Sequence, residues 1–533
     1  MAKYKHVMSK GQVNSVHSKI LGREKDMAHN NGGGVTFKVG KWEMLSRFLN
    51  LGADSGTFYL SERNHQYTNY KNVLDCIKTD GVKVVDTLRD VSVRGLAQKN
   101  DHAIFALALC FVHGNELTKE AASLALNDVC RTGTHILMFV QFIKGLRGFG
   151  KSVRNAINNW YLSKDTKDMA FQLSKYQNRD GWSHRDVFCL THPAFGKNSS
   201  RNKIAKWSMG LEDALKYGDN KDEGLQFLWA VDNAKTCDID SLIELVKKYG
   251  LQREHIPTEY LNDAKVQEFM LPNLGATALV RNLGNMSKSG LLKPLSKASK
   301  FVVSKLDDDE FLRKGRVHPL SLFLAQKTYT SGRGMRGNGA WEVNANVSAS
   351  LEKAFYRSFD LVEPTNKNYF FGVDISGSMT MPMGGSPASC HEVATIIALT
   401  MAKVEPYTFV GGFGTNFVNL GITSSDNLNS ALRKTQGNFG STNPGSAIEY
   451  AIKNKIDVDV FVFVTDNEVN TGSHPSQVLS KYRTVMNKPN CKMIVVGLTA
   501  SNFTIADPND PRMLDIAGFS PDLTTVITNF AKD

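Results

Sequence analysis

The sequence predicts two parts of different fold class: an α-helical repeat array (an α-solenoid) over residues 1–366, and a doubly wound α/β domain over residues 367–533. Three observations carry this prediction. From about residue 41 to 365, apolar residues recur at helical spacing and strand signals are scarce. From about residue 367, apolar runs typical of buried strands alternate with helical segments. The first of those strands runs into the sequence Asp-x-Ser-x-Ser.

Two segments illustrate the helical part. One helix is predicted from apolar residues at positions i, i+3, i+4 and i+8, namely Ala121, Leu124, Ala125 and Val129. A second helix starts at Asp238 or Asp240 as the N-cap and ends at Gly250, and its apolar stripe consists of Leu242, Leu245, Val246 and Tyr249. The length of the region favours a solenoid of helix pairs over a single bundle. No fixed sequence period is visible, so the repeats are degenerate.

The α/β part is predicted to hold four buried parallel strands with helices between them. The strands are expected at Tyr369 to Val373, Tyr407 to Val410, Val460 to Val464 and Met493 to Leu498. The helices are expected at His391 to Val404, Ser446 to Lys455 and Pro475 to Met486. Near the start of the chain, a basic polar arm ends at Gly34 and is followed by a short strand at Val35 to Val39.

Oxygen-bearing side chains gather at the predicted strand ends. Asp374 ends the first strand, Ser376 and Ser378 follow it, Thr442 lies in a Gly-rich turn, and Asp466 ends another strand. Ligands collect at the carboxyl ends of strands in open α/β sheets. Hard oxygen donors suit Mg²⁺ or Mn²⁺. The alternative is a polar turn whose two serines only cap a helix.

Charge is distributed unevenly over the 533 residues. The net charge is +12, but residues 369–533 carry 11 Lys and Arg against 14 Asp and Glu, whereas the remainder carries 53 against 38. The N-terminal part is therefore expected to bind an anionic partner, with nucleic acid first among the candidates. The alternative is a basic face that only keeps the protein soluble.

Composition also limits the setting of the protein. Seven scattered cysteines without a Cys-x-x-Cys pair fit free thiols in a reducing cytoplasm and make zinc unlikely. No apolar stretch reaches the roughly 18 residues of a membrane span. The N-terminus has no apolar segment of the kind that directs secretion.

Residues 145–152 match the Walker A phosphate-loop pattern Gly-x-x-x-x-Gly-Lys-Ser. The preceding run from Thr134 to Lys144 has helical periodicity, however, and a phosphate loop requires a strand there. The preferred interpretation is a Gly-rich turn between two helices, with Arg147, Lys151 and Arg154 on a basic surface. Hydrolysis of a nucleoside triphosphate is the less favoured alternative.

A second basic stretch combines cations with aromatic rings. Lys175, Arg179 and Arg185 are expected either to contact phosphates or to lie on a solvated face. His184 could offer donors to bases and riboses or be a satisfied cap residue, and Trp182 is expected to be part of the core.

These residues resemble one family, the TROVE-module proteins typified by the Ro autoantigen, with a C-terminal von Willebrand factor A domain that carries a metal-ion-dependent adhesion site. The matching stretches are residues 32–35, 56–59, 131–135, 181–186, 255–259, 281–286, 318–320 and 465–468. The resemblance implies a monomeric ring of HEAT-like helix pairs closed by the A domain. It also implies a divalent cation at the five predicted oxygen-bearing residues. The family usually has Asp after the metal-site Thr, and here it is Asn443, which removes one charge near the site.

For function, the resemblance implies a cytoplasmic RNA-binding protein that is not an enzyme and works in RNA quality control. Single-stranded 3′ ends of misfolded noncoding RNA would enter the ring, and Y-like small RNA would bind the outer basic face. The RNA-binding residues expected are Lys175, Arg179, His184, Arg185, Arg131 and Lys151. An exoribonuclease is a further expected partner, and an acidic protein partner that completes the metal site is a second hypothesis.

Overall fold

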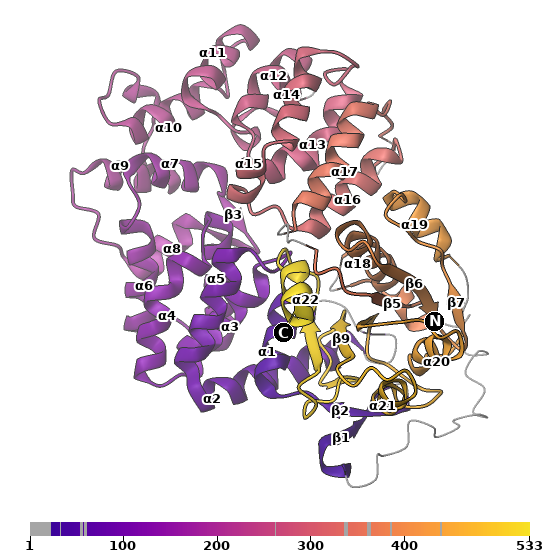
Figure 1. Ribbon diagram of the computed structural model, residues 1–533. Helices are drawn as coiled ribbons and strands as arrows, with labels where there is room; N and C mark the ends of the chain where they lie inside the picture. The colour runs from indigo at the N-terminus through magenta and orange to yellow at the C-terminus, as the bar shows by residue number, and fades with distance from the viewer. Residues whose placement is uncertain are drawn as a thin grey trace. The chain divides into compact units, whose positions relative to one another are not determined.

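The computed structural model describes residues 23–532, except 32, 54–56, 58–60, 262, 335–338, 360–363, 384–385 and 437–439. The basic arm before residue 23 and most of the predicted motif at residues 56–59 therefore lie outside the described residues. The chain forms two compact units. Val73–Ser358 form the helical unit, and the residues up to Asn72 join those from Phe359 onward in the α/β unit. The predicted fold class, helices followed by a doubly wound domain, is confirmed (Figure 1).

The helical unit is built from helices that pack on near neighbours along the chain (Figure 1). After α2 (Glu62–Arg94), whose continuity is broken at Asp80, it contains these helices: α3 Asp101–His113, α4 Glu116–Val129, α5 Gly133–Leu146, α6 Lys151–Leu162, α7 Thr166–Lys175, α8 His184–Thr191, α9 Ser200–Ser208, α10 Glu223–Asn233, α11 Ile239–Tyr249, α12 Ala264–Met270, α13 Ala276–Lys288, α14 Lys297–Leu306, α15 Asp309–Lys314, α16 Pro319–Thr330 and α17 Ala345–Arg357. Each helix buries one face against its neighbours, as α3 does against α4 and α5, α4 against α6, and α7 against α10. Within the described residues, no helix has the length and apolar character needed to cross a membrane.

Two predicted helices show how well local signals work. Helix α11 begins where Asp238 caps the Ser241 amide and ends at Gly250 in the left-handed conformation, as expected. Helix α4 exists, but its predicted apolar stripe is wrong at Leu124, whose side chain is 78% exposed. Its buried face is instead Ala122, Ala125, Leu126 and Val129. The next leucine along the helix occupies the core position that Leu124 was expected to fill.

The first and last parts of the helical unit meet. Arg316 Nε donates a hydrogen bond to the Val93 carbonyl over 2.9 Å, and His318 Nε2 lies 3.3 Å from the Leu96 carbonyl. A carbonyl only accepts, so His318 Nε2 is the donor, while its Nδ1 accepts the Leu320 amide at the start of α16. The turn before α16 thus fastens to the end of α2, more than 200 residues earlier, and the unit closes on itself.

The α/β unit contains a six-stranded sheet of order β11-β9-β8-β5-β6-β7. Its strands are β5 Tyr369–Asp374, β6 Thr408–Phe413, β7 Phe417–Asn419, β8 Val460–Thr465, β9 Lys492–Gly497 and β11 Met513–Ala517. All neighbours are parallel except β7, which pairs antiparallel with β6 at one edge. The four predicted strands are β5, β6, β8 and β9, whereas β7 and β11 were not predicted. The helices of this unit are α1 Lys41–Leu51, α18 Cys390–Val404, α19 Leu428–Lys434, α20 Gly445–Lys453, α21 Pro475–Val485 and α22 Leu523–Lys532.

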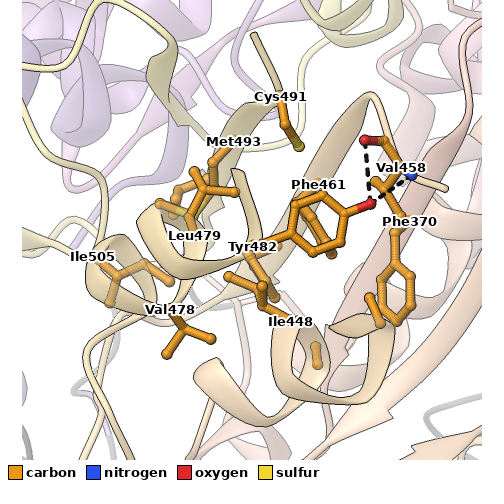
Figure 2. Packing of buried hydrophobic residues seen from close by; sticks show 14 of the residues in the cluster. Phe370, Ile448, Val458, Phe461, Val478, Leu479, Tyr482, Cys491, Met493 and Ile505 are labelled. Carbon is orange, nitrogen blue, oxygen red and sulfur yellow. Dashed lines mark hydrogen bonds between the residues drawn. The ribbon is translucent and has the colours of Figure 1, made fainter. Parts of the chain in front are cut away.

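The central strands are continuously apolar because helices cover both sides of the sheet. Every residue of β5 and β8 is buried. Figure 2 shows one side of this core, where Phe370 and Phe461 face Tyr482 and Leu479 of α21. The Tyr482 ring meets Phe461 edge-on at 5.0 Å between centroids, and its hydroxyl accepts the Val458 amide over 2.7 Å. The buried hydroxyl is thereby satisfied.

The N-terminal segment belongs to the α/β unit. The predicted strand after Gly34 is confirmed as β2 (Val35–Lys38), which pairs with β1 (Met27–His29) and, across the chain, with β10 (Phe503–Thr504). Helix α1 then inserts Arg47, which is fully buried. Its guanidinium donates to the Ser501 and Phe503 carbonyls, both over 2.9 Å, and pairs with Asp515 of β11. The predicted boundary at residues 366–367 therefore does not coincide with the division into compact units.

Replacing Arg47 by alanine is expected to lower the free energy of unfolding of the α/β unit by about 3–5 kcal/mol, because it leaves Asp515 and two carbonyls without their partner. Denaturant titration monitored by circular dichroism measures this loss. Arg63→Ala removes an exposed arginine of α2 and should change the stability by no more than about 0.5 kcal/mol. Equal midpoints for the two variants would show that the Arg47 bonds do not stabilise the unit.

Candidate metal centre and nucleic-acid interface

The predicted metal residues come together at the carboxyl ends of β5 and β8. Asp374 Oδ1 accepts the Ser376 amide over 3.0 Å, and the Ser376 and Ser378 hydroxyls lie 3.1 Å apart. Ser376 stands at the N-cap position of a short 3-10 turn, but its side chain makes no capping bond. The hydroxyl therefore points at the site and not at the turn's amides, which argues against the capping alternative.

The two carboxylates of this site are enclosed and uncompensated. Asp374 is 0% exposed and Asp466 is 2% exposed. Burial, and then the charge of Asp466, raise the pKa of Asp374 to about 7, while burial raises the pKa of Asp466 to about 6. Hydrogen bonds from the Thr465 hydroxyl to Asp374 and from the Glu468 amide to Asp466 offset part of this cost.

The backbone of Thr442 is hydrogen-bonded to the loop that follows Asp466. Its amide donates to Asn470 Oδ1 over 2.9 Å, and its carbonyl accepts the Asn470 and Thr471 amides. The same turn reaches the serine loop, because the Gly377 amide donates to the Gly440 carbonyl. Asn443 uses its side-chain oxygen to accept the Ser446 amide and so begins α20.

This donor set fits a hard divalent cation. Two carboxylates and three hydroxyls are the ligand chemistry of Mg²⁺ or Mn²⁺. Across the described part of the chain, no group of three or more His, Cys, Asp and Glu side chains is arranged to hold a metal. The hydroxyls of Ser376, Ser378 and Thr442 would therefore have to supply the remaining ligands.

The second candidate site is a basic hairpin in the helical unit. Strand β3 (Asn178–Arg179) pairs with β4 (Trp182–Ser183) through a two-residue turn in which Asp180 and Gly181 both have positive φ. Ser183 and Asp186 then form a capping box that starts α8. Arg179 of β3 and Arg185 of α8 are both exposed. Arg179 Nε lies 3.4 Å from Asp180 Oδ1 in an exposed ion pair, which a phosphate could replace.

Lys175 lies at the end of α7, directly before the hairpin. It is half-buried, and its Nζ lies 5.1 Å from the centre of the Phe171 ring and 5.4 Å from that of Tyr176. Burial lowers the pKa of Lys175, although the charge of Glu254 opposes this shift. The ammonium group is thus partly desolvated and held in place, which strengthens its attraction to a phosphate.

Direct RNA contact by His184 is a prediction that the structure contradicts. The residue is 1% exposed and both ring nitrogens are bonded. Nε2 donates to the Tyr176 carbonyl over 3.0 Å, and Nδ1 accepts the Tyr161 hydroxyl over 2.8 Å. Burial lowers its pKa to about 4, so the ring is neutral near pH 7. His184 fixes the base of the hairpin from inside.

The Gly-rich segment at residues 145–152 joins this surface. Its residues 147–150 form the turn between α5 and α6, as predicted, and a helix, not a strand, leads into this turn. The Phe149 and Trp182 rings lie 6.1 Å apart, and Trp182 Nε1 donates to Gln141 Oε1. Trp182 is partly buried, so it lies at the edge of the core and not inside it as predicted. The ring contact joins the turn before α6 to the hairpin, and Lys151, two residues after Phe149, is exposed.

Comparison with known proteins agrees with this arrangement of domains. Residues 28–250 and 248–329 match the TROVE domain, and residues 368–531 match the Ro60 vWA domain. The RNA-binding protein RO60 of Deinococcus radiodurans is 36% identical over 517 residues, 96% of each chain. The chain belongs to the Ro family. The RNA-binding protein RO60 of Caenorhabditis elegans is 30% identical over 595 residues, covering 98% of this chain and 92% of that one.

A solved structure of the same family supports the fold. The crystal structure of the Deinococcus radiodurans Ro (RSR) protein superposes with a TM-score of 0.69 and 34% identity, over 92% of this chain and 99% of that one. The Ro-family assignment made from the motifs is therefore confirmed over nearly the whole chain.

Contacts that the sequence did not suggest brace the loop beside the candidate metal centre. Asn31 Nδ2 donates to Glu468 Oε1 over 2.7 Å, and Asn30 Nδ2 donates to the Val469 carbonyl over 2.8 Å. A Cβ atom at Gly34 would lie only 2.3 Å from that carbonyl oxygen. The N-terminal turn thus packs onto the loop that follows Asp466, and the close approach explains a glycine at position 34.

Arg131 lies in the turn between α4 and α5. It is the remaining residue that was predicted to bind RNA. It is half-buried, and its Nε has no hydrogen-bond partner. Its environment differs from that of the exposed hairpin arginines.

Without divalent ions, Asp374 and Asp466 in the folded protein keep protons that the same residues in the unfolded chain release above about pH 4. The raised pKa values therefore stabilise the folded state at low pH, and this contribution disappears as pH rises toward 7. We expect the free energy of unfolding in EDTA to fall by a few kcal/mol between about pH 4.5 and 7, because a pKa raised by one unit contributes about 1.4 kcal/mol. Asp466→Asn should flatten that slope in denaturant titrations.

Asp426→Asn is the control, because Lys434 and hydrogen bonds lower the pKa of Asp426 to about 2 despite its burial. Its titration lies below the measured range and the slope should stay that of the wild type. A steep slope in Asp466→Asn would show that the carboxylate pair does not cause the pH dependence.

Proposed function

We propose that this protein is a cytoplasmic, monomeric RNA-binding scaffold for RNA quality control and not an enzyme. The observation that carries the proposal is the cationic face around the Phe149–Trp182 contact, where Arg179, Arg185 and Lys151 are exposed on a rigid hairpin and an adjoining turn. The relatives named as RNA-binding proteins, and the excess of basic residues outside the A domain, support it.

The mechanism follows from the width and charge of RNA. Double-stranded parts of Y-like small RNA or of a misfolded noncoding RNA would bind the basic face through phosphates, with little sequence preference. A single-stranded 3′ end would pass through the closed helical unit, which a duplex is too wide to enter. An RNA with both features would be selected by shape, and a bound exoribonuclease could then act on its end.

RNA affinity should depend strongly on salt. If about six phosphates are contacted, we expect the dissociation constant for structured RNA to rise roughly a thousandfold between about 50 and 200 mM salt. Filter binding or fluorescence anisotropy over a salt series measures the slope. A flat response would contradict binding through phosphates.

Lys175→Ala/Arg179→Ala should raise the dissociation constant for hairpin RNA about tenfold or more, because two charge-assisted contacts are lost. A single-stranded oligonucleotide should be affected less. Lys78→Ala/Lys247→Ala removes the same charge from exposed positions on α2 and α11 and serves as the control. Equal losses for hairpin and single strand, or for the two double variants, would place the RNA elsewhere.

We further propose that Asp374, Ser376, Ser378, Thr442 and Asp466 hold a divalent cation, with Mg²⁺ first and Mn²⁺ second. Support comes from the two enclosed carboxylates, which no cation pairs with among the residues that the structure describes. When bound, the ion would neutralise this pair and could accept a carboxylate from a protein partner. The alternative is an ion that only braces the loops.

Asp374→Ala should abolish Mg²⁺ binding in isothermal titration calorimetry and any Mg²⁺-dependent capture of an acidic protein partner, while RNA affinity changes less than twofold. Asp426→Ala is the matched control and should keep Mg²⁺ binding. Loss of RNA binding in Asp374→Ala would show that the ion is structural for the whole protein.

A further inference from the structure

The seam at which the helical unit closes concentrates positive charge. Three segments meet there: the end of α2, the turn after α4, and the turn before α16. Ser92 Oγ donates to the Asp128 carbonyl over 2.8 Å, and Arg316 Nε donates to the Val93 carbonyl over 2.9 Å. The Arg316 side chain also lies against Gly95, where a Cβ would be 3.2 Å from that of Arg316. Arg131 follows the turn after α4 and so enters the same seam.

Arg316 lies close enough to Arg131 for its charge to disfavour the charge of Arg131. Burial first, and then the charge of Arg316, lower the pKa of Arg131 to about 10. Within the described residues, neither arginine forms an ion pair with a carboxylate. The seam carboxylate of Asp128 is bonded to Arg89. Arg131 Nε is enclosed without any partner. An anion placed between the two guanidinium groups would compensate both charges.

The start of α5 adds to the positive potential. Arg131 precedes the N-cap Thr132, and the first turn of α5 contains no acidic residue. The Gly133 amide donates to Gln172 Oε1, and the His135 amide donates to the Thr132 hydroxyl. The helix therefore attracts an anion mainly through its dipole and not through these two amides. His135 Nδ1 is enclosed with no partner, and burial lowers the pKa of this ring to about 4. His135 is therefore neutral, and the candidate phosphate ligands are Arg131 and Arg316.

We propose that Arg131 and Arg316 form a phosphate-binding site at the closing seam of the helical unit, and that its ligand is a backbone phosphate of single-stranded RNA. The site rests on the proposed RNA-binding function and adds a contact distinct from the hairpin. Two guanidinium groups can bind one phosphate through paired charge-assisted hydrogen bonds. A phosphate here would also link the first and last parts of the closed unit.

The test compares Arg131→Gln/Arg316→Gln and Arg316→Gln with the wild type, using a fluorescent ten-nucleotide oligo(A) RNA. Arg316 is exposed, so its single variant remains informative if the double variant fails to fold. Arg313→Gln removes an exposed arginine one turn earlier and is the matched control. We expect Arg316→Gln to lower the affinity for oligo(A) about tenfold, and the double variant to lower it more. The salt slope should fall by about 0.7, the value for one phosphate on a single strand. Arg313→Gln should bind like the wild type.

A thermal-shift series with inorganic phosphate, against chloride at equal ionic strength, distinguishes the sources of phosphate. A phosphate-dependent rise in midpoint that is lost in Arg316→Gln supports the site when oligo(A) affinity falls in parallel. The same rise with unchanged oligo(A) affinity would overturn the proposal in favour of a free phosphate. Wild-type affinity in Arg316→Gln, or an equal loss in Arg313→Gln, would also overturn it. If the wild type binds neither hairpin RNA nor oligo(A), it is the proposed function that fails.

Discussion

Charges of like sign that lie close together, with no counter-charge among the described residues, are the constraint common to both candidate sites. In the α/β unit, Asp374 and Asp466 are enclosed at the ends of two neighbouring parallel strands, and only hydroxyl and amide dipoles compensate them. In the helical unit, Arg131 and Arg316 meet where the unit closes. Each arrangement costs free energy in the isolated chain because the surroundings screen charge poorly. An ion of opposite sign relieves that cost, so these are the places where ligand binding and stability are coupled.

Much of the fold could be predicted from local pattern. The runs that became β5 and β8 are apolar at every position, which is the pattern of strands covered on both sides. Capping residues placed the ends of α11 correctly. Pairing between distant segments could not be predicted, because no local signal joins Phe37 of β2 to Thr504 of β10. The same holds for Arg47, which looks like an ordinary surface residue of an amphipathic helix until Asp515 and two carbonyls surround it.

The site residues divide in the same way. The metal-centre residues could be found because strand ends in a parallel sheet share one edge, so that position in sequence dictates position in space. His184 was assigned to the surface on its chemistry, yet its burial depends on Tyr161 on α6 and the Tyr176 carbonyl, which only the packing of α6, α7 and α8 brings together. Trp182 was assigned to the core on its size, although a two-residue hairpin places it at the edge of the core beside Phe149. Residue type therefore predicted the chemistry of this region better than its exposure.

The Gly-rich segment before α6 shows why a motif needs its structural context. A phosphate loop and an interhelical turn both require glycines for a tight reversal and a cation at the following helix start. Gly148 adopts a positive φ here, and Lys151 is the first residue of α6. A true phosphate loop follows a strand, whose end aims several amides at one point, whereas this segment follows the last turn of α5. The lysine is exposed at the start of α6, in a segment that the Phe149 ring joins to the hairpin, so it adds charge to the surface and does not close a nucleotide pocket.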